Sequence, residues 1–314
     1  RLVFSFHYLN DAPIISARNH PDLEGNVNGP SLIAAPGWLA NPPGKYLLYF
    51  AHHEGRSIRL AASDNLTGPW KLVKPGPLDL EHSMFAETEP SEADLDPEAK
   101  FYIEAGSDGL YPHIASPDVW VDEHQREIRM YYHGRLANGL QRTRLALSRD
   151  GLNFTARLPV LGLPYMRLFP HGGWYYAIAM PGQTYRSRDG LDDFETGPRL
   201  TREPIRHHAI LEHEGQCYVL WTRIGDRPER ILLSELNIAA DWQDWRLGAT
   251  HEIHRAEKPW EGAILAPRAS QPGACMEPVN QLRDPAIFQE NGKTYLLYAV
   301  AGEQGIAIGE LRRT

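Results

Sequence analysis

The sequence predicts an all-β fold, a five-bladed β-propeller, and three observations lead to this prediction. Short runs of β-branched and aromatic residues recur along the chain, each bounded by Gly, Pro, Asn or Asp, which is the usual signal for strands. These runs group into five segments of similar order, and repeats of about 40–50 residues built from four strands are typical of a propeller. No stretch keeps a 3.6-residue apolar period over three turns, so helices are not expected to build the core.

The expected strands follow one another in five sets. Aromatic second strands such as 45–50 and 294–300 follow turns rich in Pro, Gly or Asn, for example 42–44 and 291–292. In chain order, the expected strands cover 29–33, 45–50, 57–63 and 70–73; 116–121, 128–132, 143–148 and 154–157; 165–169, 174–179 and 184–187; 207–211, 217–222, 230–236 and 245–247; 284–288, 294–300 and 305–311. The fifth set lacks an outer strand, which residues 2–6 would supply, closing the ring and removing an open edge.

The spacing of the repeats predicts one domain over residues 1–314 with two insertions, 74–112 and 248–283. Each insertion separates a fourth strand from the next first strand. Because four antiparallel strands return the chain to the face where the first strand began, both insertions should lie on the face where Asp118 begins its strand. Long loops on a rigid scaffold are a common place for binding sites, so we expect this to be the active face.

Composition excludes some classes of function. The net charge of −8 matches the charge of residues 74–112 alone, which carry ten acidic side chains and two lysines, so the rest of the chain is nearly neutral. Nucleic-acid binding needs a basic face and is not expected. No run of 18 apolar residues exists, so no membrane-spanning helix is expected.

Cofactor and metal motifs are also missing from the sequence. No glycine-rich nucleotide loop or nucleophile elbow stands between a strand and a helix, so we expect no cofactor. Cys217 and Cys275 match no metal motif, are expected to be thiols rather than a disulfide, and do not fix the compartment. The many histidines lack zinc-site spacing, and we predict no metal.

Several short segments resemble glycoside hydrolase family 43 and its relatives, which are five-bladed propeller glycosidases. The segments are Ser116-Pro117-Asp118-Val119, the strands Gly-Lys-Tyr-Leu-Leu-Tyr and Gly-Lys-Thr-Tyr-Leu-Leu-Tyr, and residues 63–70. The resemblance covers most of residues 28–312. It implies a base aspartate on blade one, a modulating aspartate on blade two and an acid glutamate on blade three. Asp118 matches the second of these, whereas Gly29-Pro30 and Arg167 stand where the other two carboxylates are expected.

Four residues are therefore the predicted catalytic groups. Asp118 would orient or tune the site, and Asp284, in the Asp-Pro pair of the fifth blade, would be the base, unless each only caps its strand by accepting backbone N–H groups. Glu261 beside Trp260 is one candidate acid, because an aromatic wall should raise its pKa, unless it is an exposed loop residue. His208 is the other, because some agar-acting relatives that resemble this chain place a histidine where the acid stands.

Histidines and arginines on the predicted active face, near the mouth of the central pocket where the inner strands begin, are the expected substrate-binding groups. The bidentate geometry of arginine suits an acidic sugar, although the same arginines would equally form ion pairs with nearby aspartates. The set comprises His52, His53, His113, His133, Arg167, His207, Arg223 and Arg283.

Together these patterns predict a glycoside hydrolase that acts on a poly- or oligosaccharide, possibly an acidic one, by general acid–base catalysis in the central pocket. Two alternatives remain open at this point. A uronate polysaccharide lyase would neutralise the substrate carboxylate with an arginine and remove a proton with His or Tyr. A sugar-binding propeller without catalysis would explain the missing carboxylates on blades one and three.

Overall fold

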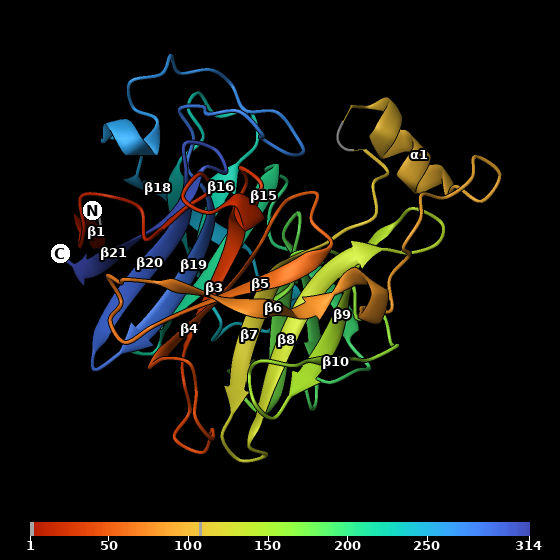
Figure 1. Cartoon of the computed structure of the whole chain (residues 1–314). Helices are drawn as coiled ribbons and strands as arrows, with labels where there is room; N and C mark the ends of the chain where they lie inside the picture. Colours follow the sequence, from red (N-terminus) through yellow and green to blue (C-terminus); the bar gives the residue numbers. More distant parts are fainter. Residues whose placement is uncertain (1–2, 107–108) are drawn as a thin grey trace.

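Five antiparallel β-sheets stand in a ring about a central axis in the computed structural model, which describes residues 3–106 and 109–314 (Figure 1). The predicted five-bladed β-propeller is thus confirmed. Each blade has its first strand at the axis and its last at the rim. Whether residues 1–314 form a single domain stays a prediction.

The strands of the five blades occur in chain order. Blade one holds β3 (Asn28–Ala34), β4 (Tyr46–Ala51), β5 (Ser57–Ser63) and β6 (Lys71–Asp79), and blade two holds β7 (Ile114–Asp122), β8 (Glu127–Arg135), β9 (Gln141–Ser148) and β10 (Thr155–Ala156). Blade three holds β11 (Arg167–His171), β12 (Trp174–Ala179), β13 (Gln183–Ser187) and β14 (Glu195–Arg199), and blade four holds β15 (Ile205–His213), β16 (Gln216–Arg223), β17 (Ile231–Leu236) and β18 (Leu247–His254). Blade five holds β19 (Arg283–Glu290), β20 (Lys293–Val300) and β21 (Gly305–Arg313).

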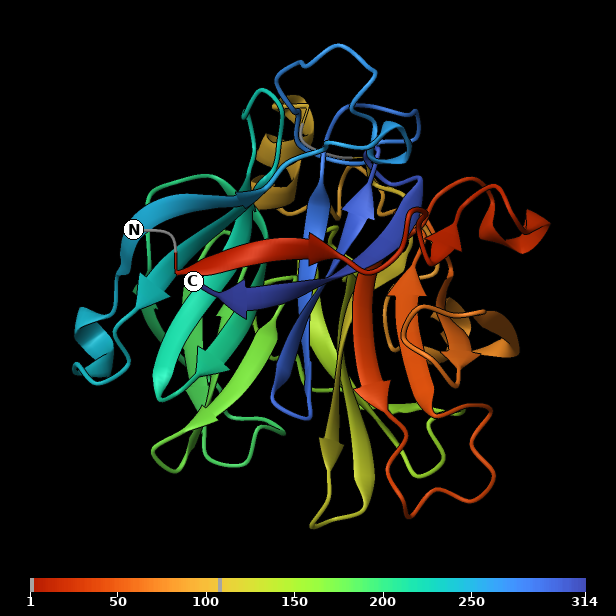
Figure 2. The same ribbon diagram turned by 90° about the vertical axis from the view of Figure 1, so that its left-hand side faces the viewer.

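The N-terminal strand closes the ring. β1 (Phe4–Tyr8) pairs antiparallel with β21, from Phe4 opposite Arg313 to Tyr8 opposite Gly309. Figure 2 shows this red strand lying along the blue C-terminal one. Phe4 is buried in a cluster with Leu211 and Tyr218 of blade four, so the closing strand also joins the last two blades.

Second strands are buried on both faces because each lies between two neighbouring blades. All six residues of β4 are buried. This explains why such strands read as continuous apolar runs rather than as alternating ones. The same burial gives the core its largest enclosed side chains, among them Tyr49, Tyr131, Trp221 and Tyr298.

Several strand limits differ from the prediction. β6 continues to Asp79 and β18 begins at Leu247 and runs to His254, so parts of both predicted insertions are strand. β14 was not predicted. The first insertion also contains a helix, α1 (Pro97–Glu104), which begins at the cap Asp96 with Pro97 in its first turn. No helix in the described part of the chain is long and apolar enough to cross a membrane.

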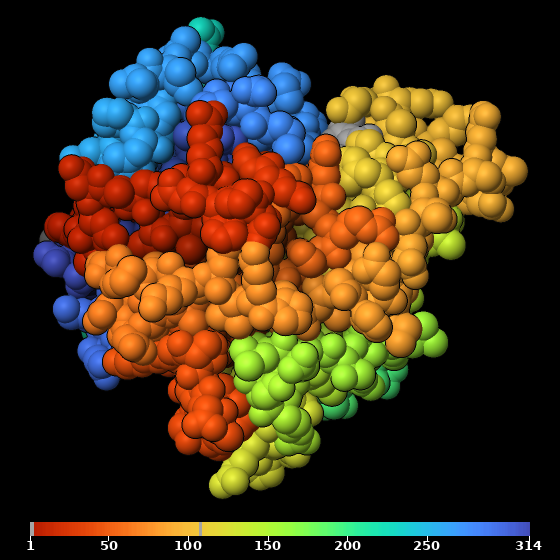
Figure 3. Space-filling view, in the orientation of Figure 1, coloured from red at the N-terminus to blue at the C-terminus, as the bar shows by residue number. Residues whose placement is uncertain are grey.

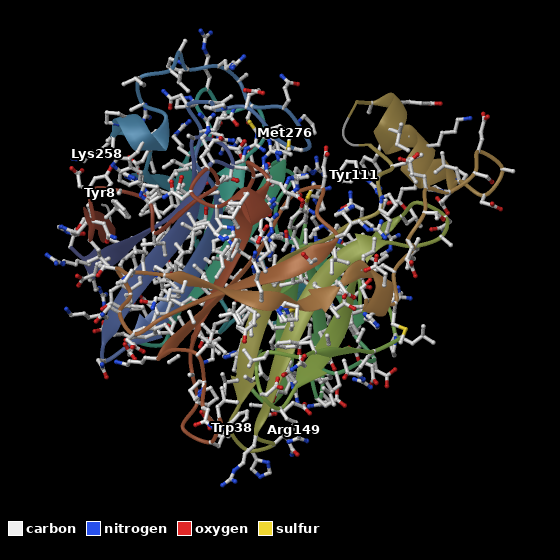
Figure 4. All side chains as sticks on the ribbon, in the orientation of Figure 1. Tyr8, Trp38, Tyr111, Arg149, Lys258 and Met276 are labelled. Carbon is white, nitrogen blue, oxygen red and sulfur yellow. The ribbon has the colours of Figure 1, made fainter. Side chains whose placement is uncertain are left out.

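Both insertions rise from the same face of the ring. Figures 1 and 2 place α1 and the segment between β18 and β19 at the top of the molecule. In the space-filling view, the gold atoms around α1 and the blue atoms of the other segment stand apart along this upper edge (Figure 3). Trp38 and Arg149 mark the opposite face (Figure 4). The inner strand β7 runs downward from the upper face, so the starts of the inner strands lie beneath the insertions.

Candidate active site at the upper end of the central axis

Bulges at the start of the inner strands shape the upper end of the axis. In blades one, two and five, two residues without a partner in β4, β8 or β20 interrupt the pairing: Gly29-Pro30, Ser116-Pro117 and Asp284-Pro285. The first residue of each pair has a positive φ, 58°, 50° and 52° respectively. Such a conformation is strained for Ser and Asp and is often found beside active sites. Asp284 is therefore the structural counterpart of Gly29. Asp118 differs from both, because it is the first paired residue after the bulge of blade two.

Asp284 and His207 form a buried carboxylate–imidazole pair between blades five and four. One Asp284 oxygen, Oδ2, accepts the Gly29 N–H at 2.9 Å, and the other contacts His207 Nδ1. Burial raises the pKa of Asp284, but His207 more than offsets this and the pKa is lowered. Burial lowers the pKa of His207 despite the carboxylate, so the ring is neutral near pH 7. His207 Nε2 is buried and has no hydrogen-bond partner among the described residues.

Aromatic rings connect His207 to two further histidines. The Tyr165 ring lies 4.4 Å from the His207 ring and 4.5 Å from the His133 ring, measured between centroids. His133 Nε2 is 3.4 Å from His113 Nε2. Burial, helped by the neighbouring histidines, holds the pKa of His133 well below its ordinary value. The structure thus brings together the predicted residues His113, His133 and His207 and adds Tyr165, which the sequence pattern did not single out as a site residue.

A second carboxylate and imidazole pair was also not predicted as a pair. Glu303, in the turn after β20, lies 2.7 Å from His53 Nδ1 through its Oε1. Its Oε2 accepts from Asn26 Nδ2 at 2.8 Å, and Arg283 NH1 lies 3.8 Å from Oε1. Burial raises the Glu303 pKa, yet His53 and Arg283 lower it far more, so Glu303 is ionised. No local signal in the sequence links residue 303 to residue 53, so this pair could not be predicted.

Asp118 and His208 join neighbouring blades through backbone groups. Asp118 Oδ2 accepts the Leu168 N–H of blade three at 3.0 Å, just as Ser31 Oγ accepts the Val119 N–H of blade two at 2.9 Å. Burial raises the Asp118 pKa against the effect of nearby Arg167. His208 Nε2 lies 2.6 Å from the Ile178 carbonyl oxygen, and burial lowers its pKa to about 3.

Glu261 is buried in a separate network beneath the second insertion. It accepts from Tyr8 OH at 2.6 Å and Tyr298 OH at 2.7 Å, and its Oε1 lies 2.7 Å from His254 Nε2. Burial alone would raise the pKa of Glu261, but these partners lower it to about 2. The raised pKa expected from Trp260 is therefore wrong, because hydrogen bonds to the charged form outweigh the loss of water.

The arginines predicted to bind substrate have partners within the protein. Arg283 donates to Gln281 Oε1 at 2.7 Å and to the Gly273 carbonyl, and Arg167 donates to the Ser116 carbonyl at 3.2 Å. Arg223 is half-buried and pairs with Glu203 and Asp226. His52 accepts from the Glu54 N–H within its own turn. Where residues are described, no group of three or more His, Cys, Asp or Glu could hold a metal ion.

A viral protein is the relative that decides the family. "Uncharacterized protein R118" of Acanthamoeba polyphaga mimivirus is 34% identical over 312 residues, which cover 91% of this chain and 83% of that protein. The chain belongs to the family of this mimivirus protein. No family model matches the chain.

Solved structures show that this chain has a known fold. CoXyl43, a family 43 β-xylosidase/α-arabinofuranosidase from a compost microbial metagenome solved with xylotriose, superposes with a TM-score of 0.60 at 12% identity and covers 98% of this chain and 94% of its own. A family 43 enzyme from Xanthomonas citri with xylotriose gives 0.59 at 11% identity, covering 96% and 88%. The RS223 β-xylosidase gives 0.56 at 12% identity, covering 92% of each chain. The fold is that of the family 43 propellers.

Proposed function

We propose that the chain is a glycoside hydrolase whose acid–base groups are two imidazoles, each held by a carboxylate. The observation that carries the proposal is the buried pair of His207 and Asp284, which leaves His207 Nε2 without a partner among the described residues. Burial and a carboxylate contact at one ring nitrogen orient the ring and leave the other nitrogen for proton transfer.

His207 and His53 suit opposite roles. His207 is neutral near pH 7, so its Nε2 can accept a proton from an attacking water, and Asp284 then stabilises the imidazolium. His53 Nδ1 lies 2.7 Å from ionised Glu303, and in this proposal the His53 ring donates a proton to the leaving oxygen while Glu303 holds it in place.

The remaining predicted catalytic residues take other roles in this proposal. Asp118 keeps the positioning role expected from the sequence, through its bond to Leu168 N–H. Glu261 is left out of proton transfer because both of its carboxylate oxygens already bond to the protein. His208 is left out because its Nε2 contacts the Ile178 carbonyl and no carboxylate holds its ring, although its buried Nδ1 has no hydrogen-bond partner among the described residues.

The choice of first substrates follows from the solved neighbours. Two of them hold xylotriose, so xylo-oligosaccharides and arabinofuranosides are the first to test. An acidic sugar has less support, because Arg167, Arg223 and Arg283 are all engaged within the protein.

A uronate lyase is the second candidate, and Tyr165 is the observation in its favour. Its ring lies between His133 and His207, and a tyrosine beside histidines suits proton removal next to a carboxylate. A lyase would form an unsaturated uronate that absorbs ultraviolet light, whereas hydrolysis would not.

Digestion of a broad glycan panel, with products identified by mass spectrometry, tests both candidates. We expect wild-type protein to release sugars whose mass has gained one water, and the variant His207→Gln to release almost none. His124→Gln, at an exposed histidine in the turn after β7, is the matched control and should behave as wild type. Binding of a glycan without any turnover would contradict the proposed enzyme and indicate a sugar-binding propeller.

A further inference from the structure

A segment of the second insertion bonds to the carboxylate that contacts the proposed acid, His53. We call residues 268–279 the strap. In Figures 1 and 2 the chain between β18 and β19 arches over the top of the molecule, and Figure 4 labels Met276 on it. The backbone N–H of Cys275 donates to Glu303 Oε2 at 3.1 Å, while Glu303 Oε1 contacts His53. One carboxylate therefore touches both the strap and the proposed acid.

Polar contacts hold the strap, whereas apolar packing contributes little. Asn26 Nδ2 lies 3.5 Å from the Cys275 carbonyl, Gln304 donates to the Met276 carbonyl at 3.1 Å, and Arg283 donates to the Gly273 carbonyl at 3.1 Å. Residues 271–278 are exposed or half-buried. Segments with few buried apolar contacts open at low free-energy cost, while the site beneath belongs to the rigid ring.

The groups beneath the strap are closed off from solvent. His53 exposes 6% of its surface, His207 4%, Asp284 2% and Glu303 none. The strap also packs tightly onto the turn that bears Glu303, since a Cβ on Gly302 would come within 2.9 Å of Cys275 Sγ. Access of a sugar to these nearly buried groups therefore depends on the segments around them, and the strap bonds directly to Glu303.

We propose that Glu303 is a positioning residue that couples closure of the strap to the orientation of His53. In the closed state its two oxygens are held separately, one by His53 and the other by Asn26 and the Cys275 N–H. Lifting the strap removes the Cys275 donor, so the carboxylate can turn and release the imidazole. The inference rests on the proposed function for the role of His53 as acid, but not for the coupling itself.

Two readouts that need no substrate test the coupling. Hydrogen exchange read by mass spectrometry reports opening of the strap, with the buried strand β16 as an internal reference. The ring-nitrogen NMR signal of His53, assigned by its loss in His53→Gln, reports its contact with Glu303.

Three variants separate the two ends of the coupling. Gln304→Ala removes the hydrogen bond from Gln304 to the Met276 carbonyl of the strap and leaves the His53 side chain unchanged. We expect faster hydrogen exchange in the strap together with a shifted NMR signal of His53. Glu303→Gln should change both readouts. His53→Gln should speed strap exchange by about fivefold or more, because coupling between two sites is reciprocal.

The coupling would be overturned if hydrogen exchange in the strap became faster in Gln304→Ala while the His53 NMR signal stayed in place. It would also be overturned if hydrogen exchange in the strap were unchanged in Glu303→Gln or in His53→Gln. If Glu303→Gln does not fold, the other two variants still decide. If no glycan of the panel is turned over, the proposed function is contradicted. The measurements of the strap and of His53 still test the coupling, because they need no substrate.

Discussion

His207 of blade four contacts Asp284 of blade five through Nδ1, and Asp284 in turn accepts the backbone N–H of Gly29 in blade one. The contact fixes Nδ1 of the ring and leaves Nε2 buried with no partner among the described residues. The neighbouring His208 instead bonds to the Ile178 carbonyl of blade three. Two adjacent histidines therefore have different partners, because the pairing of β15 with β16 is interrupted between Ile205 and His208 and His207 lies within that interruption.

Replacing Asp284 by Asn should lower turnover by about 10²–10⁴-fold, the usual contribution of acid–base catalysis. The amide keeps an acceptor for the Gly29 N–H but supplies no negative charge to the protonated His207 ring. The measurement is kcat on the first substrate that the glycan panel identifies, with circular dichroism to verify folding.

Asp118→Asn is the matched comparison for Asp284→Asn. Asp118 binds a backbone N–H rather than a titrating ring, so its loss of turnover should be smaller. Equal losses of turnover in the two variants would indicate that Asp118 takes part in the chemical step.

Replacing Glu261 by Gln should destabilise the protein by about 3 kcal/mol at pH 7, the value that corresponds to its pKa shift from 4.5 to about 2. Because the folded pKa lies below the unfolded one, this stability is present above about pH 4.5 and is lost as the pH falls toward 2. Urea unfolding at several pH values measures it.

Glu257→Gln is the control for Glu261, because Glu257 is exposed and contributes only its backbone N–H to the network. Its free energy of unfolding should stay near the wild-type value. A Glu261→Gln protein as stable as wild type would contradict the structural role assigned to Glu261.

His208 should make the protein less stable in mild acid. Its pKa is lowered from 6.5 to about 3 in the folded state, so unfolding takes up a proton below pH 6.5. Each pH unit between these values should cost about 1.4 kcal/mol of stability. Stability measured at pH 7 and pH 5 should therefore fall less in His208→Gln than in wild type, by about 2 kcal/mol. An equal fall in both proteins would show that His208 is protonated when folded.

Truncating the ring-closing strand at Phe4 should be costly. Phe4 is 1% exposed, and Phe4→Ala should lower the free energy of unfolding by about 3–5 kcal/mol. Phe101→Ala on α1 is the control, because Phe101 is 66% exposed and its replacement should change stability by less than about 0.5 kcal/mol. Similar losses in both variants would mean that β1 does not secure the ring.

The blade architecture could be predicted from the sequence because its signals are local. Turn residues at 172–173, 214–215 and 291–292 separate runs that must pair with their chain neighbours, and the incomplete fifth repeat required a strand from the N-terminus. Edges such as β6 and β18 were misplaced because exposed outer strands carry little apolar signal.

The site depended on contacts that only closure of the ring creates. Glu303 meets His53, and Asp284 meets His207, because residues from different blades converge at one axis. Burial lowered the pKa of His207, whereas charged and hydrogen-bonding partners outweighed burial at these carboxylates and left Glu261 ionised rather than raised in pKa. The sequence alone determined the five blades and the mouth on which the histidines lie. The tertiary structure decided which of these histidines face a carboxylate, since a partner across the ring leaves no trace in the local pattern.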